Sequence, residues 1–376
     1  MAITELKKNE KYRIQVIKGH KYVNGVKVHE KTSYIFYGKK SEARIKENEI
    51  KLKIKTGEYI NTEDKTYNDL IDKWYQEKAL NLDPKTVEGY DSLLVNIRKE
   101  LGYYKITELK TFLFDEFYNK LRNNNKKLSE NTILHYYTLN NAILNQCVKW
   151  DLIEKNYNSK AQRPKPIKKE AKFYDEEEIK RLLSCLENEP LKNQVVIRLA
   201  LDSGCRRGEL TGLNWADIDF KNSTITINKT TQVLRNKTVE KNKPKNNSSI
   251  RTVKIADPTI ELLKAYKNEQ EELKKSLGSE WQNCKKILIN NYGGLMHPDT
   301  PSKIFKKVQK KYNLKDLNFH GLRHTSASMY IDTKSNTNLV AKRLGHASSI
   351  TTANIYSHLF KNAENEALDR VSAKYY

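Results

Sequence analysis

The sequence predicts a multi-domain, mainly α-helical chain with small β-sheets, an α+β fold. The 376 residues allow two or three domains at roughly 150 residues each. The start of the chain carries β-rich runs, the middle keeps helical spacing, and the remainder mixes both patterns. We therefore expect three domains, at residues 1–62, 63–165 and 166–376.

The first block is predicted to be a small sheet with one helix. The runs Lys11–Ile17 and Lys31–Gly38 are rich in β-forming residues, and Asn24-Gly25 between them is a strong signal for a hairpin turn. Residues 41–55 follow as a charged helix. Lys, Arg and Tyr side chains on such a sheet can enter a DNA major groove, although the same charges would also suit a solvated surface.

The second block is predicted to be helical throughout. Apolar side chains recur at helical spacing in four stretches, at Tyr67–Tyr75, Val87–Ile97, Phe114–Leu121 and Ile133–Cys147. Because such stripes usually mark the packed face of a helix, we interpret them as core. A basic, proline-containing linker at 163–166 closes the block.

The third block mixes helices with a patch of strands. Helices are predicted at 176–186 and 193–201, and strands are predicted at 223–227, 231–234 and 251–255. A Lys- and Asn-rich stretch at 235–249 is predicted to be a loop.

The charge of the chain predicts a polyanionic partner. The sequence has 69 Lys and Arg against 46 Asp and Glu, a net charge of +23. Folding does not require such a surplus, and the usual partner of a basic protein is nucleic acid. We therefore expect the chain to bind double-stranded DNA, but charge does not reveal whether it is an enzyme.

Several classes of protein are disfavoured. The sequence contains no run of about 18 apolar residues, and its N-terminus has no apolar stretch, so we expect neither a membrane span nor a secretory signal. The four cysteines are scattered without a CxxC pair. This pattern favours a cytoplasmic protein without disulfides or a cysteine zinc site.

Four short motifs in the third block carry the candidate chemistry. They contain Arg206 with Glu209, then Lys245, then His320 with Arg323, and finally His346 followed ten positions later by Tyr356. If Glu209 continues a helix from Arg206, the two share a face and the carboxylate can hold the guanidinium rigid. His320 and Arg323 would likewise lie one helical turn apart.

These residue types suit a phosphoryl transfer that needs no metal. Guanidinium groups can stabilise the charge that develops on the non-bridging oxygens of a phosphodiester. A lysine can protonate a leaving 5′-hydroxyl. A tyrosine can act as nucleophile if positive charge or a base lies nearby, because its unperturbed pKa is about 10.

All four motifs in this order resemble those of the tyrosine recombinase family, the integrases of phages and conjugative transposons. The resemblance covers the three blocks and is strongest over the third. It implies an arm-type DNA-binding domain, a helical core-binding domain and a catalytic domain with a C-terminal tail.

The resemblance also implies roles for the basic residues. Arg206 and Arg323 correspond to the arginines that clamp the phosphate, and Glu209 to the acidic residue beside the first. Lys245 corresponds to a β-hairpin lysine that acts as general acid. Three other lysines share its loop, so this assignment stays open among Lys237, Lys241, Lys243 and Lys245.

The remaining roles concern proton transfer and the nucleophile. His320 resembles the histidine that assists proton transfer, and His346 the one that bonds the scissile phosphate. Tyr356 resembles the nucleophile, which implies a 3′-phosphotyrosyl bond and a free 5′-hydroxyl. Because that link conserves the phosphodiester energy, the family needs neither ATP nor a metal, and we expect no cofactor.

By the same resemblance, protomers are expected to assemble as a tetramer on DNA and to exchange strands through a Holliday junction. DNA-bending and directionality factors are further expected partners. Ala367, Leu368 and Val371 keep helical spacing in the tail 362–376, which we expect to dock on a neighbouring protomer. A prophage and a conjugative element remain equally open as the source.

Two other functions share part of this pattern. A type IB topoisomerase uses the same tyrosine chemistry but would not need the first block. A non-catalytic DNA-binding regulator would not require the complete set of motifs. A zinc site of His320, His324 and His346 is disfavoured because no HExxH motif is present and Arg323 would repel a cation.

Three residues beside the motifs receive structural interpretations. Arg207 is interpreted as a surface or structural residue, because the motif spacing selects Arg206. His324 and His358 are interpreted as packing groups, or as groups that support the catalytic residues without reacting.

Overall fold

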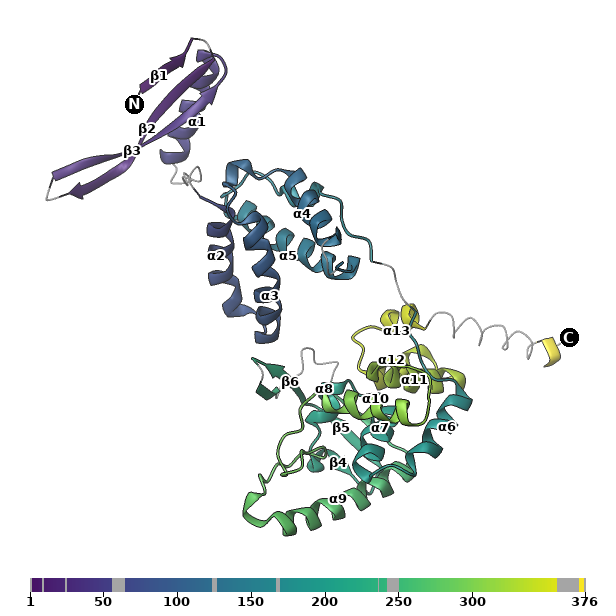
Figure 1. Ribbon diagram of the computed structural model, residues 1–376. Coiled ribbons are helices and arrows are strands. Elements are labelled where there is room, and N and C mark those ends of the chain that lie inside the picture. The colour runs from purple at the N-terminus through teal and green to yellow at the C-terminus, as the bar shows by residue number, and fades with distance from the viewer. Residues whose placement is uncertain are drawn as a thin grey trace. The chain divides into compact units, whose positions relative to one another are not determined.

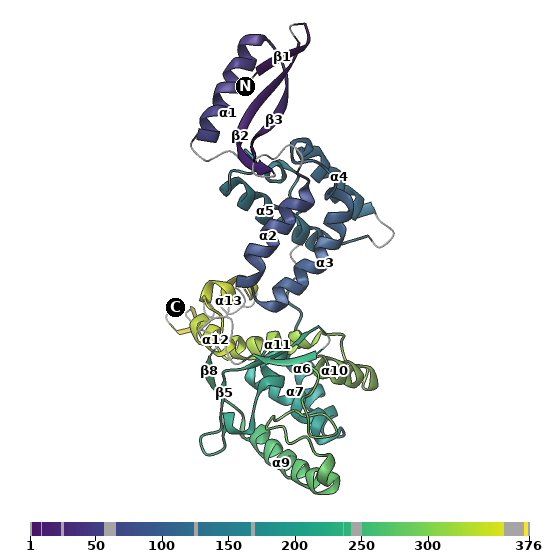
Figure 2. The same ribbon diagram turned by 90° about the vertical axis from the view of Figure 1, so that its left-hand side faces the viewer.

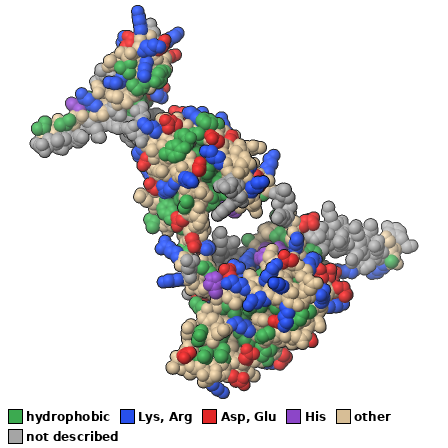
Figure 3. Space-filling view, in the orientation of Figure 1, with side chains coloured by type: hydrophobic (Ala, Val, Ile, Leu, Met, Phe, Trp, Pro, Cys, Tyr) green, Lys and Arg blue, Asp and Glu red, His purple; other side chains and the backbone are tan. Residues whose placement is uncertain are grey.

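The computed structural model describes residues 2–8, 10–23, 26–55, 65–123, 127–166, 170–235, 237–241, 250–356 and 372–374. The chain divides into two compact units, Met1–Ile167 and Lys168–Tyr376 (Figure 1). Blue Lys and Arg side chains are spread over the visible face of each unit, as the net charge of +23 leads one to expect (Figure 3). None of the helices in the described part of the chain combines the length and apolar character needed to cross a membrane.

The chain begins with a three-stranded antiparallel sheet that one helix covers (Figure 2). The elements are β1 (Ala2–Lys7), β2 (Lys11–Val23), β3 (Val26–Tyr37) and α1 (Lys40–Lys55). The two predicted β-rich runs and the predicted helix are confirmed, and the predicted turn at 24–25 lies outside the described residues. Strand β1 was not predicted, because half of its sequence AITELK is polar and, of its described side chains, Ile3 alone packs against the core.

Alternation along β2 gives the sheet a buried and an open face. Tyr12, Ile14 and Val16 are fully buried and form a small core with residues of α1. Side chains in a strand point alternately to opposite faces, so Arg13 between them is on the open face and is exposed. The β2–β3 register places Ile35, also exposed, opposite Arg13.

Four helices follow in the first unit, as predicted, and share one core (Figure 1). They are α2 (Tyr67–Lys78), α3 (Pro84–Leu101), α4 (Thr111–Asn123) and α5 (Glu130–Lys149). Their starts have local causes: the Thr66 side chain caps α2, Asp83 caps α3 before its first-turn proline, and Ser129 caps α5. Most of the residues interpreted as core are buried, whereas Tyr75, Val87 and Tyr90 are half-buried.

Between residues 170 and 356 the described part of the second unit contains eight α-helices and five strands, and most of them contribute to one large core. Its helices are α6 (Glu176–Leu186), α7 (Leu191–Ser203), α8 (Arg207–Gly212), α9 (Asp257–Leu277), α10 (Thr300–Lys311), α11 (Phe319–Asp332), α12 (Thr337–Leu344) and α13 (Ser349–Ile355). Helix α7 packs against α9, α10 and α11, and each of its residues is buried or half-buried. The apolar residues of α7 therefore form the centre around which the candidate site is assembled.

Strands of the second unit form two small antiparallel sheets. They are β4 (Ile218–Asp219), β5 (Thr224–Ile227), β6 (Thr230–Leu234), β7 (Lys237–Lys241) and β8 (Arg251–Lys254), paired as β4–β5–β8 and β6–β7. The three predicted strand signals are confirmed.

The prediction of a loop at 235–249 is wrong for residues 237–241, which form strand β7. Thr230 pairs with Lys241 and Leu234 with Lys237, so this charged stretch is a strand. Glu240 also holds β7 in place, because it forms an ion pair of 2.7 Å with the buried Lys286. The strand is hard to predict from its polar sequence, because β7 has a single partner strand and none of its side chains is fully buried.

Candidate active site

The junction between α7 and α8 positions Arg206. Gly204 ends α7 in the left-handed conformation with φ 60°, and a Cβ there would lie 2.8 Å from the side chain of Leu344. Arg206 is therefore extended and caps α8 instead of belonging to it. Glu209 accepts hydrogen bonds from the backbone N–H of Arg206 at 2.9 Å and from its Nη1 at 2.8 Å.

The predicted Arg206–Glu209 pair is thus present, but its geometry differs from the prediction. The two residues do not share a helical face, because the turn at Gly204 leaves Arg206 outside the helix. The carboxylate instead reaches back to the residue before the helix, as in a capping box. This holds both the backbone and the guanidinium of Arg206.

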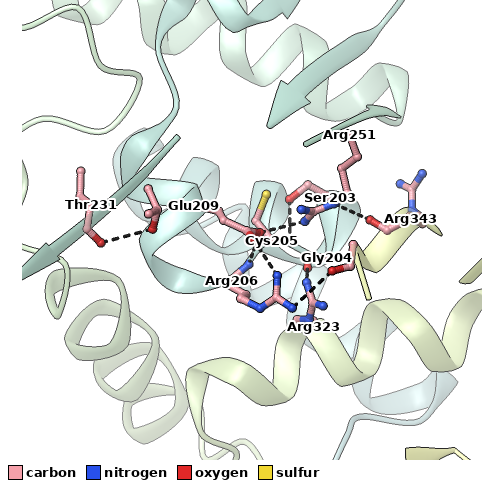
Figure 4. Close-up of polar contacts among 11 residues, drawn as sticks. Ser203, Gly204, Cys205, Arg206, Glu209, Thr231, Arg251, Arg323 and Arg343 are labelled. Carbon is pink, nitrogen blue, oxygen red and sulfur yellow. Dashed lines mark hydrogen bonds and ion pairs between the residues drawn. The ribbon is translucent and has the colours of Figure 1, made fainter. Parts of the chain in front are cut away.

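A second arginine, Arg251, shares the carboxylate of Glu209. Its Nη2 lies 2.9 Å from Glu209 Oε2, and the two side chains are 4% and 9% exposed. Its Nε donates to the backbone oxygen of Arg343 at 2.7 Å, which ties β8 to α12 (Figure 4). Burial alone would raise the pKa of Glu209, but Arg251 and Arg206 outweigh it and lower that pKa.

Arg323 lies on α11 and is almost fully buried. Its Nη1 donates to the backbone oxygen of Gly204 at 2.7 Å, while its Nη2 is buried without a hydrogen-bond partner among the described residues (Figure 4). Burial and the positive charge of Arg206 lower the pKa of Arg323 to about 10. A buried guanidinium with an unused donor is costly unless an anion binds there.

His320 lies one helical turn before Arg323, as predicted. Partial burial and then the charges of Arg323 and Arg206 lower the pKa of His320. Its ring makes an edge contact with that of His324, with centroids 4.9 Å apart. His320 therefore carries a neutral imidazole at the border of the arginine cluster at pH 7.

His346 follows the left-handed Gly345 that ends α12 with φ 67°. Arg206 Nη2 lies 3.5 Å from the backbone oxygen of Gly345, which brings the α8 and α12 motifs together. The Nδ1 of His346 is 2.7 Å from the hydroxyl of the buried Thr352, so this contact fixes the ring. Burial and then Arg323 lower the pKa of His346 to about 4.

Tyr356 directly follows α13 and is only 1% exposed. Its ring packs on apolar residues of α11 and α12, among them Ala327 and Leu344. Its hydroxyl is 2.7 Å from His324 Nδ1, and its backbone N–H donates to the oxygen of Thr352 at 3.0 Å. Burial raises the pKa of Tyr356, although Arg323 acts in the opposite direction.

The structure thus brings six of the seven predicted residues to one place. These are Arg206, Glu209, His320, Arg323, His346 and Tyr356. The seventh, Lys245, and the alternative Lys243 lie outside the described residues. The β6–β7 hairpin that precedes them is fixed to α8, because the hydroxyls of Thr231 and Thr211 are hydrogen-bonded.

Sequence reasoning missed the supporting roles of two residues in contact with this cluster, Arg251 and Thr352. The sequence does carry a signal for Arg251. It lies on the same strand face as the buried Val253, and a charged residue at such an inward position is expected to have a buried partner. His324, interpreted as a packing or supporting group, contacts the tyrosine hydroxyl itself. The described residues include no group of three or more His, Cys, Asp or Glu side chains arranged to hold a metal.

Comparison with known proteins gives the family. The family model described as the phage integrase family matches residues 172–363. A tyrosine recombinase XerC-like protein of Caldanaerobacter subterraneus subsp. tengcongensis is 29% identical over 359 residues, which cover 90% of each chain.

Two solved structures share the fold. The Tn1549 transposon integrase in complex with a circular intermediate DNA has a TM-score of 0.68 at 20% identity, over 81% of this chain and 100% of that one. A lambda integrase tetramer bound to a Holliday junction has a TM-score of 0.56 at 17% identity, over 85% of this chain and 90% of that one. Since the family model spans just over half of the sequence, including the clustered residues, the chain belongs to the phage integrase family of tyrosine recombinases, which are site-specific DNA strand transferases.

Proposed function

We propose that the chain excises and integrates a mobile genetic element through a covalent link between Tyr356 and a DNA 3′-phosphate. The observation that carries the proposal is the buried Arg323, whose unused Nη2 belongs to a cluster that also contains Arg206, His346 and the tyrosine. An anion between these groups would satisfy the unused donor. A scissile phosphate has the required charge and would meet the nucleophile there.

In the proposed cleavage, the phenolic oxygen of Tyr356 attacks phosphorus and the bond from phosphorus to the 5′-oxygen breaks. Arg206 and Arg323 stabilise the negative charge on the non-bridging oxygens. Lys245 protonates the leaving 5′-oxygen, and His320 assists proton transfer. The Nε2 of His346 bonds the phosphate, since its Nδ1 faces Thr352.

The reaction as proposed requires neither a divalent metal nor ATP. The guanidinium groups supply the positive charge that a metal would otherwise provide. The phosphotyrosyl bond conserves the energy of the broken phosphodiester, so the released 5′-hydroxyl can reverse the reaction on the same or a different strand. Cleavage should therefore persist in the presence of a chelator.

DNA binding is proposed to be divided among three domains. Residues 1–62 would read an arm-type site through the open face of the sheet, where Arg13 is exposed. The helical domain, 63–165, and the catalytic domain, 166–376, would hold the core site from opposite sides. Removing residues 1–62 should abolish footprints on an arm-type site while leaving those on the core site.

Assembly is proposed to follow the arrangement reported for lambda integrase, a tetramer bound to a Holliday junction. The tail 362–376 would dock on a neighbouring protomer and couple cleavage to assembly. Almost all of this segment lies outside the described residues. Deleting residues 362–376 should abolish synaptic complexes on a gel, and unchanged complexes would refute this role.

The experiment that tests the proposed function is covalent capture. The full chain is incubated with chromosomal DNA from cells that encode it, denatured, and recovered with any attached DNA for sequencing. We expect one short site to be enriched, in the presence of EDTA as well as in its absence. If no DNA stays attached to the wild-type chain, the proposal is wrong. Relaxation of supercoiled DNA without exchange of partners would indicate the topoisomerase alternative.

A further inference from the structure

His324 contacts the proposed nucleophile in a way that the family motifs do not explain. Its Nδ1 lies 2.7 Å from the hydroxyl oxygen of Tyr356, and the two ring centroids are 5.7 Å apart. On helix α11, His320, Arg323 and His324 are spaced i, i+3 and i+4, so they share one face. The helix that presents the phosphate-binding arginine therefore also presents an imidazole to the tyrosine.

We propose that His324 is a catalytic residue that accepts the proton which Tyr356 loses as it attacks the phosphate. This rests on the proposed function. The bond between the phenolic oxygen and phosphorus forms as the hydroxyl proton passes to Nδ1, which leaves His324 as an imidazolium. The bond to the 5′-oxygen breaks, and that oxygen takes a proton from the general acid. In ligation, the imidazolium returns its proton to the departing tyrosine.

The electrostatics of the site suit this direction of transfer. Burial, His320 and Arg323 lower the pKa of His324 to about 4, so its ring is neutral at pH 7 and Nδ1 can accept a proton. Burial raises the pKa of Tyr356, so the hydroxyl stays protonated and needs a base. A bound phosphate would offset the charge of Arg323 and so make His324 more basic when attack occurs.

The other imidazoles of the site are less well placed for this role. His346 already uses its Nδ1 on the hydroxyl of Thr352. His320 touches the ring of His324, whereas His324 itself is hydrogen-bonded to Tyr356. The geometry therefore separates the two sides of the reaction: His324 serves the nucleophile, and the general acid serves the leaving group.

Chemical rescue tests the proposal. His324→Ala leaves a space beside Tyr356 that free imidazole can enter. On a nicked duplex carrying the captured site, we expect adduct formation to slow about 100-fold, the lower range for general base catalysis, with DNA binding unchanged. Added imidazole should restore part of the rate, and more basic substituted imidazoles should restore more. His297→Ala, which removes an exposed histidine, should show neither effect.

A second variant separates proton transfer from positioning and covers poor folding of the alanine variant. In His324→Asn, Oδ1 can replace Nδ1 as a hydrogen-bond acceptor but cannot take up a proton. We expect this variant to be about as slow as His324→Ala. A wild-type rate for His324→Asn, or a rescue that does not depend on the basicity of the imidazole, would overturn the proposal.

A substrate with sulfur in place of the 5′-bridging oxygen identifies the side of the reaction on which His324 acts. A thiolate leaves without protonation, so this substrate should restore cleavage by Lys245→Ala but not by His324→Ala. Restoration of His324→Ala would place the residue on the leaving group and overturn the proposal. A wild-type chain that forms no adduct would overturn the proposed function as well, whereas normal cleavage by His324→Asn would overturn only the role of His324.

Discussion

The N-terminal sheet and the arginine cluster both present positive charge, but they differ in burial. On the sheet, Arg13 is exposed to solvent. In the cluster, Arg251 and Arg323 are buried, and Arg251 is fixed by the carboxylate of Glu209. Exposed charges are screened by salt and can be replaced by one another, whereas buried charges are held in position and have few substitutes. We therefore expect the sheet to contribute to DNA affinity and the cluster to contribute the chemistry.

The largest expected effect is that of Arg323→Lys. A lysine keeps the charge but cannot donate to Gly204 and a phosphate from one planar group. We expect adduct formation to slow by about 100-fold or more, as on loss of a transition-state donor. Binding measured by gel shift should change little. A cleavage rate close to wild type would show that Arg323 does not stabilise the scissile phosphate as proposed.

Arg251→Met tests the buried ion pair with Glu209, the carboxylate that also holds Arg206. The substitution leaves the buried Glu209 without Arg251, which is more deeply buried than its other ion-pair partner Arg206, so the second unit should lose about 3–5 kcal/mol of unfolding free energy. Urea denaturation of the full chain measures the loss. Arg207→Met breaks an exposed pair with Asp299 and should cost less than about 1 kcal/mol. Equal losses for both variants would contradict the importance of burial.

Thr352→Val tests how His346 is positioned. The substitution removes the hydroxyl from the 2.7 Å contact with Nδ1 but keeps the side-chain shape. We expect cleavage to slow about tenfold, equivalent to about 1.4 kcal/mol, and Thr352→Ser to retain most of the rate. The rate of adduct formation on the captured site is the measurement. Equal rates for the valine and serine variants would show that the hydroxyl is dispensable.

Low pH should destabilise the second unit through two of its histidines, His324 and His346. Burial lowers the pKa of His324 and of His346 to about 4 in the folded chain, against an ordinary value of 6.5. The unfolded chain therefore binds more protons between these values, and stability is lost as the pH falls from about 6.5 towards 4. The unfolding free energy of His346→Asn should depend less steeply on pH over this range. An equally steep dependence would contradict the shifted pKa of His346.

Arg13→Ala should give the smallest effect. Because the side chain is exposed on the open face of the sheet, the unfolding free energy should change by less than about 0.5 kcal/mol. If Arg13 contacts a phosphate, the slope of DNA affinity against salt should fall by about 1. Binding to an arm-type duplex over a range of salt concentrations measures this slope. An unchanged slope would exclude such a contact.

The sequence was most informative where a pattern is local. Helical spacing predicted α2 to α5, and motif spacing predicted Arg206, Arg323 and Tyr356. Contacts between distant segments left no such pattern: the sharing of Glu209 by Arg251 joins residues 42 positions apart. The bond between His324 and Tyr356 likewise depends on how Tyr356, directly after α13, packs against α11 and α12. Strand β7 was missed for a related reason, since its partner strand and Lys286 decide its structure.

The central claim is that Tyr356 carries the DNA. The most direct measurement is mass spectrometry of the captured adduct after digestion with nuclease and trypsin. The tryptic peptide from residue 344 to 361 contains Tyr356 as its single tyrosine. We predict a nucleotide attached to this residue through its 3′-phosphate, and no adduct from Tyr356→Phe. A nucleotide on another residue, or an adduct that survives the phenylalanine substitution, would contradict the claim.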